Sequence, residues 1–324
     1  RLEFTAEWYK NKSEDLLYSV PVPAQTGVSN TSVTMNAASM ENSGFEFSAT
    51  YRNHDHALKY DISANVSTLK NKVTSLGIGK DSYISGPYAT YVGQEIGKFY
   101  GWVYKGIART QEDLDNNAVQ QGANVGDCLY EDISGPDGTP DGVIDAYDQT
   151  VLGSGLPKVN FGLSTHMEYK GFDLNISTYG VLNYHVSDDI YNSLNSCYGY
   201  GNKEVGMLDA NRWSEDGTYL SSVPRTYAAN NATLAWNDLF SSRKIQNAAY
   251  WKIANVELGY NFPDKWFGGY VSGVRLYVSA QNLYTFTGYH GYNVDYAGGT
   301  FTPGYNFCSF PSARTFMCGL HFTF

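Results

Sequence analysis

Apolar and polar residues alternate with a period of two in segment after segment of this chain. From Val274 to Gln281, for example, the even positions are apolar and the odd ones mostly polar. Successive side chains of a strand point to opposite faces, so each such segment predicts a strand with one apolar and one polar face. The pattern is clear in nine segments, at 1–15, 41–52, 58–73, 97–108, 157–170, 172–184, 250–262, 274–284 and 312–324. No long segment keeps a helical period near 3.6, and the sequence therefore predicts an all-β fold.

The lengths of these segments and of their connections favour a membrane-spanning antiparallel barrel. About 9–11 residues is what a tilted strand needs to cross a bilayer. Short connections are predicted at 53–57, 170–171 and 263–273, and long ones at 16–40, 74–95, 185–249 and 285–311. Short turns at one end and long loops at the other are typical of outer-membrane barrels. If both chain ends lie on the periplasmic side, the strand number is even, and Asp127–Ile133 is the best candidate for a tenth strand.

Composition excludes several classes of protein. Aromatic residues make up 15% of the 324 residues, which excludes intrinsic disorder. The net charge is -10 and there is no long Lys/Arg run, which argues against nucleic-acid binding. The sequence has no run of about 18 apolar residues, so it predicts no membrane-spanning helix. The chain starts with Arg1 and has no basic-plus-apolar leader, so it is either mature or a piece of something longer. A secreted β-sandwich also alternates, and it stays open as the soluble alternative.

Several local runs resemble one family. They are Gly126-Asp-Cys-Leu-Tyr-Glu-Asp132 with Asp141-Gly-Val-Ile-Asp145, Leu156-Pro-Lys-Val-Asn-Phe-Gly162, Asn211-Arg-Trp213, Tyr250-Trp-Lys-Ile-Ala-Asn-Val-Glu-Leu-Gly-Tyr260, Val278-Ser-Ala-Gln-Asn-Leu-Tyr284, and an alternating last strand that ends on Phe324. In this order they resemble the SusC/RagA-like TonB-dependent outer-membrane transporters over essentially the whole chain.

The resemblance implies that residues 1–324 are the C-terminal portion of such a barrel, about ten of about 22 strands. The plug domain and the N-terminal strands are then not in this chain. It implies a multi-pass β-barrel in the outer membrane of a Gram-negative bacterium, in contact with membrane lipid. It also implies TonB-dependent uptake of oligosaccharides or peptides together with a SusD-like surface lipoprotein, with TonB acting through the missing N-terminal part. The chain itself would not be an enzyme. The alternatives are a secreted glycan-binding or glycan-cleaving β-protein and a passive porin.

An Asp-rich stretch is the sharpest chemical motif. Counted from Asp137, oxygen-bearing side chains stand at positions 1, 3, 5, 9 and 12, and Gly142 stands at position 6. This is the spacing of a calcium loop, in which the residue at position 7 offers its backbone carbonyl. The predicted ligands are Asp137, Thr139, Asp141, Val143, Asp145 and Asp148, with Asp132 as an alternative first ligand. An ordinary Asp/Gly turn closed by Asx hydrogen bonds is the competing interpretation.

Other candidates concern substrate, catalysis and thiols. Aromatic rings in the long loops can stack on sugar rings or peptide side chains. The acidic pairs Asp188–Asp189 and Glu215–Asp216 are read as solvated surface, and His54-Asp-His56 as a turn. Glu257, Asn255 and Trp251 are expected to share the lumenal face. A Cys308–Cys318 disulfide and two free thiols both remain open. The candidate substrate-binding residues are Tyr198, Tyr200, Trp213, Tyr219 and Trp236.

Overall fold

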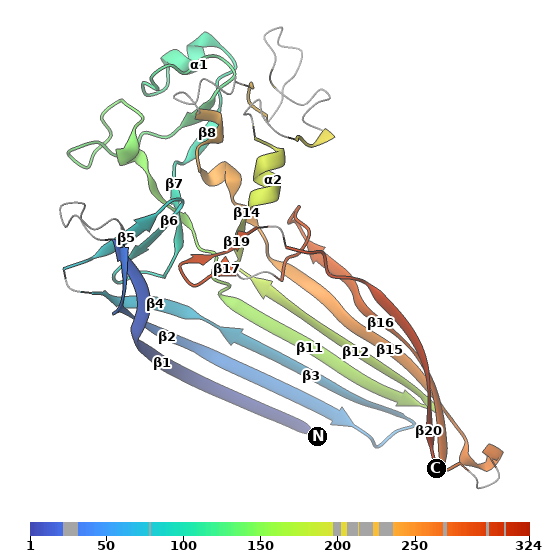
Figure 1. Cartoon of the computed structure of the whole chain (residues 1–324). Helices are drawn as coiled ribbons and strands as arrows, with labels where there is room; N and C mark the ends of the chain where they lie inside the picture. Colours follow the sequence, from blue (N-terminus) through green and yellow to red (C-terminus); the bar gives the residue numbers. More distant parts are fainter. Residues whose placement is uncertain are drawn as a thin grey trace.

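One large antiparallel sheet dominates the structure, and the short elements gather beyond one of its ends (Figure 1). The computed structural model describes residues 1–21, 32–77, 79–196, 202–205, 213, 223–226, 236–267, 271–295, 298–307 and 309–324. The strands of the large sheet follow the order β1-β2-β3-β11-β12-β15-β16-β20. Their bounds are Leu2–Pro21, Ser32–Asn53, Leu58–Thr68, Val159–Tyr169, Phe172–Leu182, Tyr250–Phe262, Gly273–Thr287 and Thr315–Thr323, and β4 (Lys70–Leu76) pairs with β2 away from this path.

The remaining elements are short. The strands are β5 (Ser82–Ser85), β6 (Tyr88–Tyr91), β7 (Lys98–Gly101), β8 (Tyr104–Ile107), β9 (Cys128–Tyr130), β10 (Thr150–Gly153), β13 (His185–Asp188), β14 (Gln246–Asn247), β17 (Gly298–Gly299), β18 (Thr302–Pro303) and β19 (Tyr305–Asn306). The helices are α1 (Gln111–Asp115), α2 (Asp189–Leu194) and the 3-10 turns η2 (Ala146–Asp148), η4 (Trp236–Asp238), η5 (Ser242–Lys244) and η6 (Asp264–Phe267). Within the described ranges, no helix has the length and apolar character needed to cross a bilayer.

The connections of the large sheet are short at one end and long at the other, as predicted. Residues 54–57, 170–171 and 263–272 join neighbouring strands at the short-turn end. The long connections 69–158, 183–249 and 288–314 leave from the opposite end, which we call the loop end. Both chain termini lie at the short-turn end (Figure 1), which agrees with an even number of strands along the sheet.

The register places apolar side chains on one face of this sheet and polar ones on the other. On one side, Phe47 is paired with Val66, Val66 with Phe161, and Leu174 with Leu258. This apolar face is exposed in the isolated chain, and its exposed members include Phe4, Trp8, Phe45, Phe47, Leu163, Leu258, Val278, Leu320 and Phe322. A wide exposed apolar face is costly in water, and it is what a lipid-facing wall requires.

Three of the predicted segment assignments are wrong. Segments 97–108 and 127–133 are not wall strands, because β7 pairs with β6 and β10, and β8 pairs with β9, in small sheets at the loop end. Their alternation reflects packing within the loops, where Phe99 and Tyr130 are fully buried. The predicted long loop 16–40 is mostly strand, since β1 continues to Pro21 and β2 starts at Ser32. About 20 residues at roughly 3.3 Å each reach about 65 Å, so this hairpin extends far beyond an apolar band of about 25 Å.

The buried core of the chain lies at the loop end and not under the sheet. Three clusters of buried apolar residues hold the long connections together. The first contains Val181, Tyr184, Val186, Ala248, Tyr250, Tyr289 and Val294, the second Ala38, Val73, Leu76 and Ile96, and the third Cys128, Tyr130 and Ile144. The loops are therefore packed structures that fix side chains above and against the polar face of the sheet.

Candidate functional site

The polar face carries a cluster of charges near the short-turn end. The guanidinium of Arg275 donates from Nε to Oδ2 of Asp173 at 3.0 Å, and it also contacts Glu257 at 2.6 Å. It lies over the ring of Tyr277, 5.2 Å from the centroid. Asn261 donates a further hydrogen bond to Asp173 at 3.0 Å. Each charge in this cluster has a partner, so this part of the wall is rigid and already satisfied.

The middle of the same face is neutral. A groove of about 540 Å³ runs across β3, β11 and β12. Its polar-face side chains include Asn65, Asn160, Ser164 and Ser177, with no acidic or basic residue in the lining. Gly162 lies where an added Cβ would be 2.9 Å from Oδ1 of Asn65, so a larger residue there would fill the groove. Amides and hydroxyls can exchange hydrogen bonds with a passing polar solute without trapping a charge.

A β-bulge reverses the facing of the first residues of β15. Ser177 is paired with Asn255 and the next residue, Thr178, with Ile253, so Ala254 is the extra residue. The expectation that Trp251 shares the face of Glu257 and Asn255 is therefore wrong. Trp251 lies on the apolar face, where it stacks on Phe286 with the ring centroids 5.3 Å apart. An inserted residue shifts the period-two pattern by one, which strict alternation cannot anticipate.

The same bulge turns Lys252 onto the polar face, under a loop. Its side chain is only 5% exposed, and its ammonium lies 2.6 Å from Oδ2 of Asp295. The hydroxyl of Tyr179 donates to Oδ1 of Asp295 at 3.3 Å, and the Lys252 ammonium lies 5.8 Å from the centroid of the Tyr179 ring. This ion pair, in which Lys252 is buried and Asp295 is partly exposed, ties the loop of residues 288–295 to the sheet wall, because separating it would leave the Lys252 charge buried without a partner.

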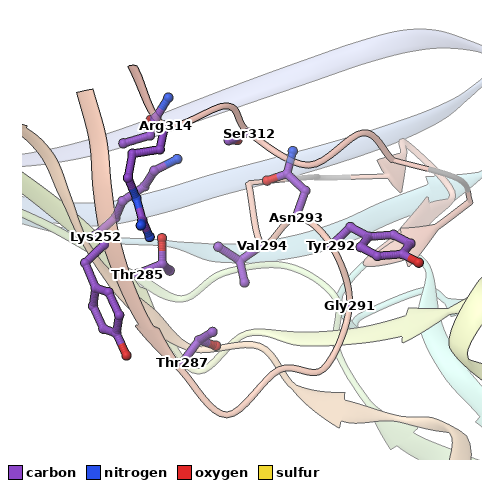
Figure 2. Close-up of a pocket in the computed structure, with 11 residues that line it drawn as sticks. Lys252, Thr285, Thr287, Gly291, Tyr292, Asn293, Val294, Ser312 and Arg314 are labelled. Carbon is purple, nitrogen blue, oxygen red and sulfur yellow. The ribbon is translucent and has the colours of Figure 1, made fainter. Parts of the chain in front are cut away.

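Beside this pair lies a pocket of about 310 Å³, which we call the loop-end pocket (Figure 2). It is bounded by the ends of β15 and β16, by residues 291–294 and by residues 312–314. Figure 2 shows Lys252, Thr285 and Arg314 toward one side of the pocket and Tyr292 at the other, with Asn293 and Val294 between them. The sequence patterns missed Lys252 and Arg314. A lysine at a position where strict alternation would face it outward was the available signal for the first, because it pointed to a break in the pattern. Arg314 had no signal beyond its place before the last strand.

A second buried polar network fastens the loops to one another. The hydroxyl of Tyr289 donates to Asp188, and the amide of Asn306 donates to the Tyr289 oxygen at 2.7 Å. Asp188 also caps α2 by accepting from the backbone N–H of Tyr191 at 2.9 Å. Burial and the neighbouring Asp188 raise the pKa of Tyr289 above its usual value. Asp188 thus serves as a structural anchor, and its neighbour Asp189 lies in the first turn of α2. The acidic pair at 215–216 lies outside the described residues.

The Asp-rich loop is closed by hydrogen bonds from its own backbone. Asp148 is buried and accepts from Ile133 at 2.8 Å, and its other oxygen accepts from Asp145 at 2.8 Å. Asp132, the alternative first ligand, accepts from the N–H of Gly142 at 2.7 Å. In the ranges the structure describes, no three His, Cys, Asp or Glu side chains gather closely enough to hold a metal ion. The loop has the form of the Asx turn described above, and calcium binding through Asp137, Thr139, Asp141, Val143, Asp145 and Asp148 stays a prediction.

Two of the five candidate aromatic residues fall within the described ranges, and both are packed. The ring of Trp213 lies so close to Gly126 that an added Cβ there would be 2.5 Å from it. Trp236 donates from its indole nitrogen to the carbonyl of Gln121 at 3.1 Å and packs against Tyr130. Contact of these two residues with substrate stays a prediction. Tyr198, Tyr200 and Tyr219 lie outside the described residues.

The run at Gly126-Asp127 has a structural role of its own. Arg225 donates to both carboxylate oxygens of Asp127, at 2.6 and 2.9 Å, and Asn237 donates to the same carboxylate at 2.8 Å. Asp127 is buried, so this bidentate pair joins loop segments about 100 positions apart. Burial raises the pKa of the nearby Cys128 thiol to about 12, so this cysteine is an unreactive core residue. Cys318 is a free thiol exposed on the sheet, and Cys308 lies outside the described residues.

Comparison with known proteins supports the same family. No family model matches the chain. Over its full length the chain is 31% identical to TonB-dependent receptor P3 of Formosa agariphila, and over 98% of its length it is 27% identical to TonB-dependent receptor SusC of Bacteroides thetaiotaomicron. It spans 32% and 29% of the lengths of these relatives.

Solved structures agree with this in fold. The chain aligns over 99% of its length with a chain of the RagAB peptide transporter, with a TM-score of 0.78 at 22% identity, and covers 33% of that chain. The RagAB peptide importer in its open-open state gives a TM-score of 0.77 at 23% identity, with 33% of that chain covered. Both confirm the predicted fold class, a portion of a large antiparallel barrel. The chain belongs to the SusC/RagA-like family of TonB-dependent receptors, and it spans about a third of the length of such a protein.

Proposed function

We propose that this chain is the C-terminal portion of the barrel wall of an outer-membrane importer that works with TonB. The observation that carries the proposal is the two-sided sheet. Its exposed apolar face fits lipid, its polar face fits a water-filled lumen, and its long packed loops all leave from one end. In this arrangement the loop end is extracellular and the short-turn end is periplasmic.

The rest of the protein supplies what this chain lacks. The edges of the large sheet, β1 and β20, have no outer neighbour within the described part of the chain. Unpaired strand edges are not tolerated in the hydrocarbon of a membrane, so further strands of the same protein must close the barrel. A plug within the lumen and contact with TonB belong to that remaining part. No covalent chemistry is required of the residues described above, whose role is to form the barrel wall and the packed loops at the loop end.

The transported solutes are proposed to be oligosaccharides or peptides, delivered with the help of a SusD-like surface lipoprotein at the loop end. The neutral groove on β3, β11 and β12 supports this proposal, because hydroxyls and amides suit both kinds of solute. The similarity to a peptide transporter in fold and to SusC in sequence supports it as well.

Uptake by cells that express the complete receptor and its lipoprotein tests the proposal. Labelled oligosaccharide and peptide mixtures should accumulate in cells with TonB and not in cells without it. Uptake that persists without TonB would instead indicate a passive porin. Membrane fractionation distinguishes the third function, since a secreted glycan-binding or glycan-cleaving protein would leave the envelope without detergent, whereas a barrel stays in the outer membrane until detergent is added.

A further inference from the structure

The loop-end pocket differs in charge from the rest of this acidic chain. The chain has 32 Asp and Glu residues against 22 Lys and Arg residues. Nevertheless the residues that line the pocket include two cations, Lys252 and Arg314, and no carboxylate. Asp295 follows Val294 of the lining in sequence, and its carboxylate is already paired with Lys252 at 2.6 Å. After this pairing the pocket keeps one uncompensated positive charge, that of Arg314.

Arg314 has no partner in the part of the chain that the structure describes. It is exposed, and neither a hydrogen bond nor an ion pair joins it to another described residue. Its guanidinium therefore keeps all five N–H donors, in the planar arrangement that binds a carboxylate through two parallel hydrogen bonds.

Further donors of the pocket are also unused. The carbonyl oxygen of the Asn293 side chain accepts from the backbone N–H of Asp295 at 2.9 Å, which leaves its NH₂ group free to donate into the pocket. The hydroxyls of Thr285 and Ser312 make no hydrogen bond with another residue in the described ranges. Thr287, by contrast, already donates to the carbonyl of Ala249 at 3.0 Å. The side of the pocket that Arg314 occupies thus offers several unused donors to an anion.

An aromatic ring completes the pocket on its other side. Tyr292 is 63% exposed and belongs to the loop that the Lys252–Asp295 pair holds against the wall. A volume of about 310 Å³ is at the small end of ligand pockets, which suits one ring or one terminal residue of a longer ligand. A ring of the ligand can lie on Tyr292 while an anionic group attached to it reaches Arg314.

We infer that the loop-end pocket is a subsite for a carboxylate carried by the transported solute, with Arg314 as its anion-binding residue and Asn293, Thr285 and Tyr292 around it. The inference rests on the proposed import function and narrows its substrate class to acidic solutes. Two sources carry this chemistry, namely the uronic acid residues of an acidic oligosaccharide and the terminal carboxylate of a peptide.

Binding to the complete receptor, purified in detergent, tests the inference with matched ligands. Trigalacturonate is compared with its neutral methyl ester, and a tripeptide that ends in a free carboxylate is compared with the same tripeptide as its amide. At least one of the two acids should bind more tightly than its neutral counterpart by about tenfold or more, since hydrogen bonds to charged groups contribute about 1.5–3 kcal/mol. Which acid is preferred identifies the source of the carboxylate.

The variant Arg314→Gln should abolish this preference, because it weakens binding of the acid far more than binding of its neutral counterpart. Arg52→Gln is the matched control, because Arg52 pairs with Glu3 at 2.8 Å near the opposite end of the sheet and outside the pocket. It should keep the preference. Equal binding of acid and neutral ligands, a preference that survives Arg314→Gln, or no binding of either acid would overturn the inference.

Uptake by cells separates this outcome from failure of the proposed function. If uptake depends on TonB but Arg314→Gln takes up the acidic solutes as well as the parent does, only the carboxylate subsite is overturned. The absence of TonB-dependent uptake for every solute would overturn the import function itself. A loss of thermal stability in Arg314→Gln without a change in ligand preference would show that Arg314 braces the barrel against strands outside this chain, and it would also refute the subsite.

Discussion

An arginine placed on either face of β11 provides a direct test of the membrane assignment. Leu163 and Ser164 are neighbours on this strand, and their side chains point to the apolar and the polar face, respectively. Both are exposed in the isolated chain, so neither change to arginine meets a packed core. The two variants Leu163→Arg and Ser164→Arg therefore differ mainly in whether the new charge faces lipid or the lumen.

The geometry of β11 places these residues near the middle of the membrane. The strand has 11 residues, so its ten steps of about 3.3 Å at a tilt of about 40° span about 25 Å along the membrane normal. That length matches the apolar band of an outer-membrane barrel, and Leu163 and Ser164 lie near its centre. An arginine on the lipid face at this depth costs about 2–4 kcal/mol, which corresponds to roughly a 30- to 700-fold change in the unfolding equilibrium constant.

Reversible unfolding of the complete receptor in lipid vesicles, followed by urea titration, measures this difference. We expect Leu163→Arg to lose about 2–4 kcal/mol of stability and Ser164→Arg to lose far less. Leu163→Ala is the control for the lost side-chain volume. Equal losses for the two arginine variants would mean that the two faces see the same surroundings, and the assignment of lipid and lumen would then be wrong.

Four further predictions concern the bulge, the buried ion pair, the acid response and the Asp-rich loop. Brominated lipid should quench the fluorescence of Trp251, so Trp251→Phe should reduce the quenching while Trp102→Phe, whose indole donates to the carbonyl of Asp145 at 2.9 Å in the loops, should not. Asp295→Ala should destabilise the protein by about 1–3 kcal/mol because it leaves the buried Lys252 ammonium without its partner, and the double change with Lys252→Met should recover most of the loss in a thermal unfolding assay. Burial raises the pKa of Glu95, but hydrogen bonds from Lys158 and Ser154 and the charge of Lys158 outweigh burial, so the pKa of Glu95 is lowered from 4.5. The ionised Glu95 therefore stabilises the folded protein above pH 4.5, and this stabilisation is lost as the pH falls through the lowered pKa. Glu95→Gln should remove this part of the dependence of stability on acid pH. Calcium at millimolar concentration should raise the unfolding temperature of the parent and not of Asp141→Asn, and an equal response of the two would end the calcium prediction.

The wall of the barrel was predictable from the sequence because lipid and lumen impose one rule on every strand. β11 and β12 pair along their whole length without a register shift, so strict alternation holds there, and the turn at Lys170–Gly171 joins them as expected. Gly171 has a φ of 88°, a conformation that glycine adopts without a steric cost, so this two-residue turn could also be identified locally. Ala254 is where the rule failed, since a single extra residue reverses the facing of Trp251 and Lys252 without any change in composition.

The loops were less predictable because their order comes from contacts between distant segments. Asp127 is anchored by Arg225 and Asn237, which lie 98 and 110 positions away, and no periodicity reports such a pairing. The alternation in 97–108 has the same appearance as that of a wall strand. Its residues nevertheless belong to small sheets. Phe99 is buried among the loops, and Gly101 lies where an added Cβ would be 2.1 Å from the carbonyl of Phe240.

The large sheet and the packed loops therefore differ in how their apolar side chains are covered. The large sheet buries little of its own apolar surface, and Leu258, Val278 and Leu320 are all about half exposed. In the proposed barrel, lipid covers that face and further strands pair with β1 and β20. The loops, in contrast, contain the fully buried residues Phe99, Cys128 and Ala248 and an ion pair, Arg225 with Asp127, in which the aspartate is buried. Because Lys252 lies on the wall and Asp295 on the loop, their contact joins the sheet and the loops at the loop end. The position of the loop-end pocket is consequently fixed by the wall, so under the proposed import function a solute that enters from the loop end would meet Tyr292 and Arg314 in a fixed arrangement.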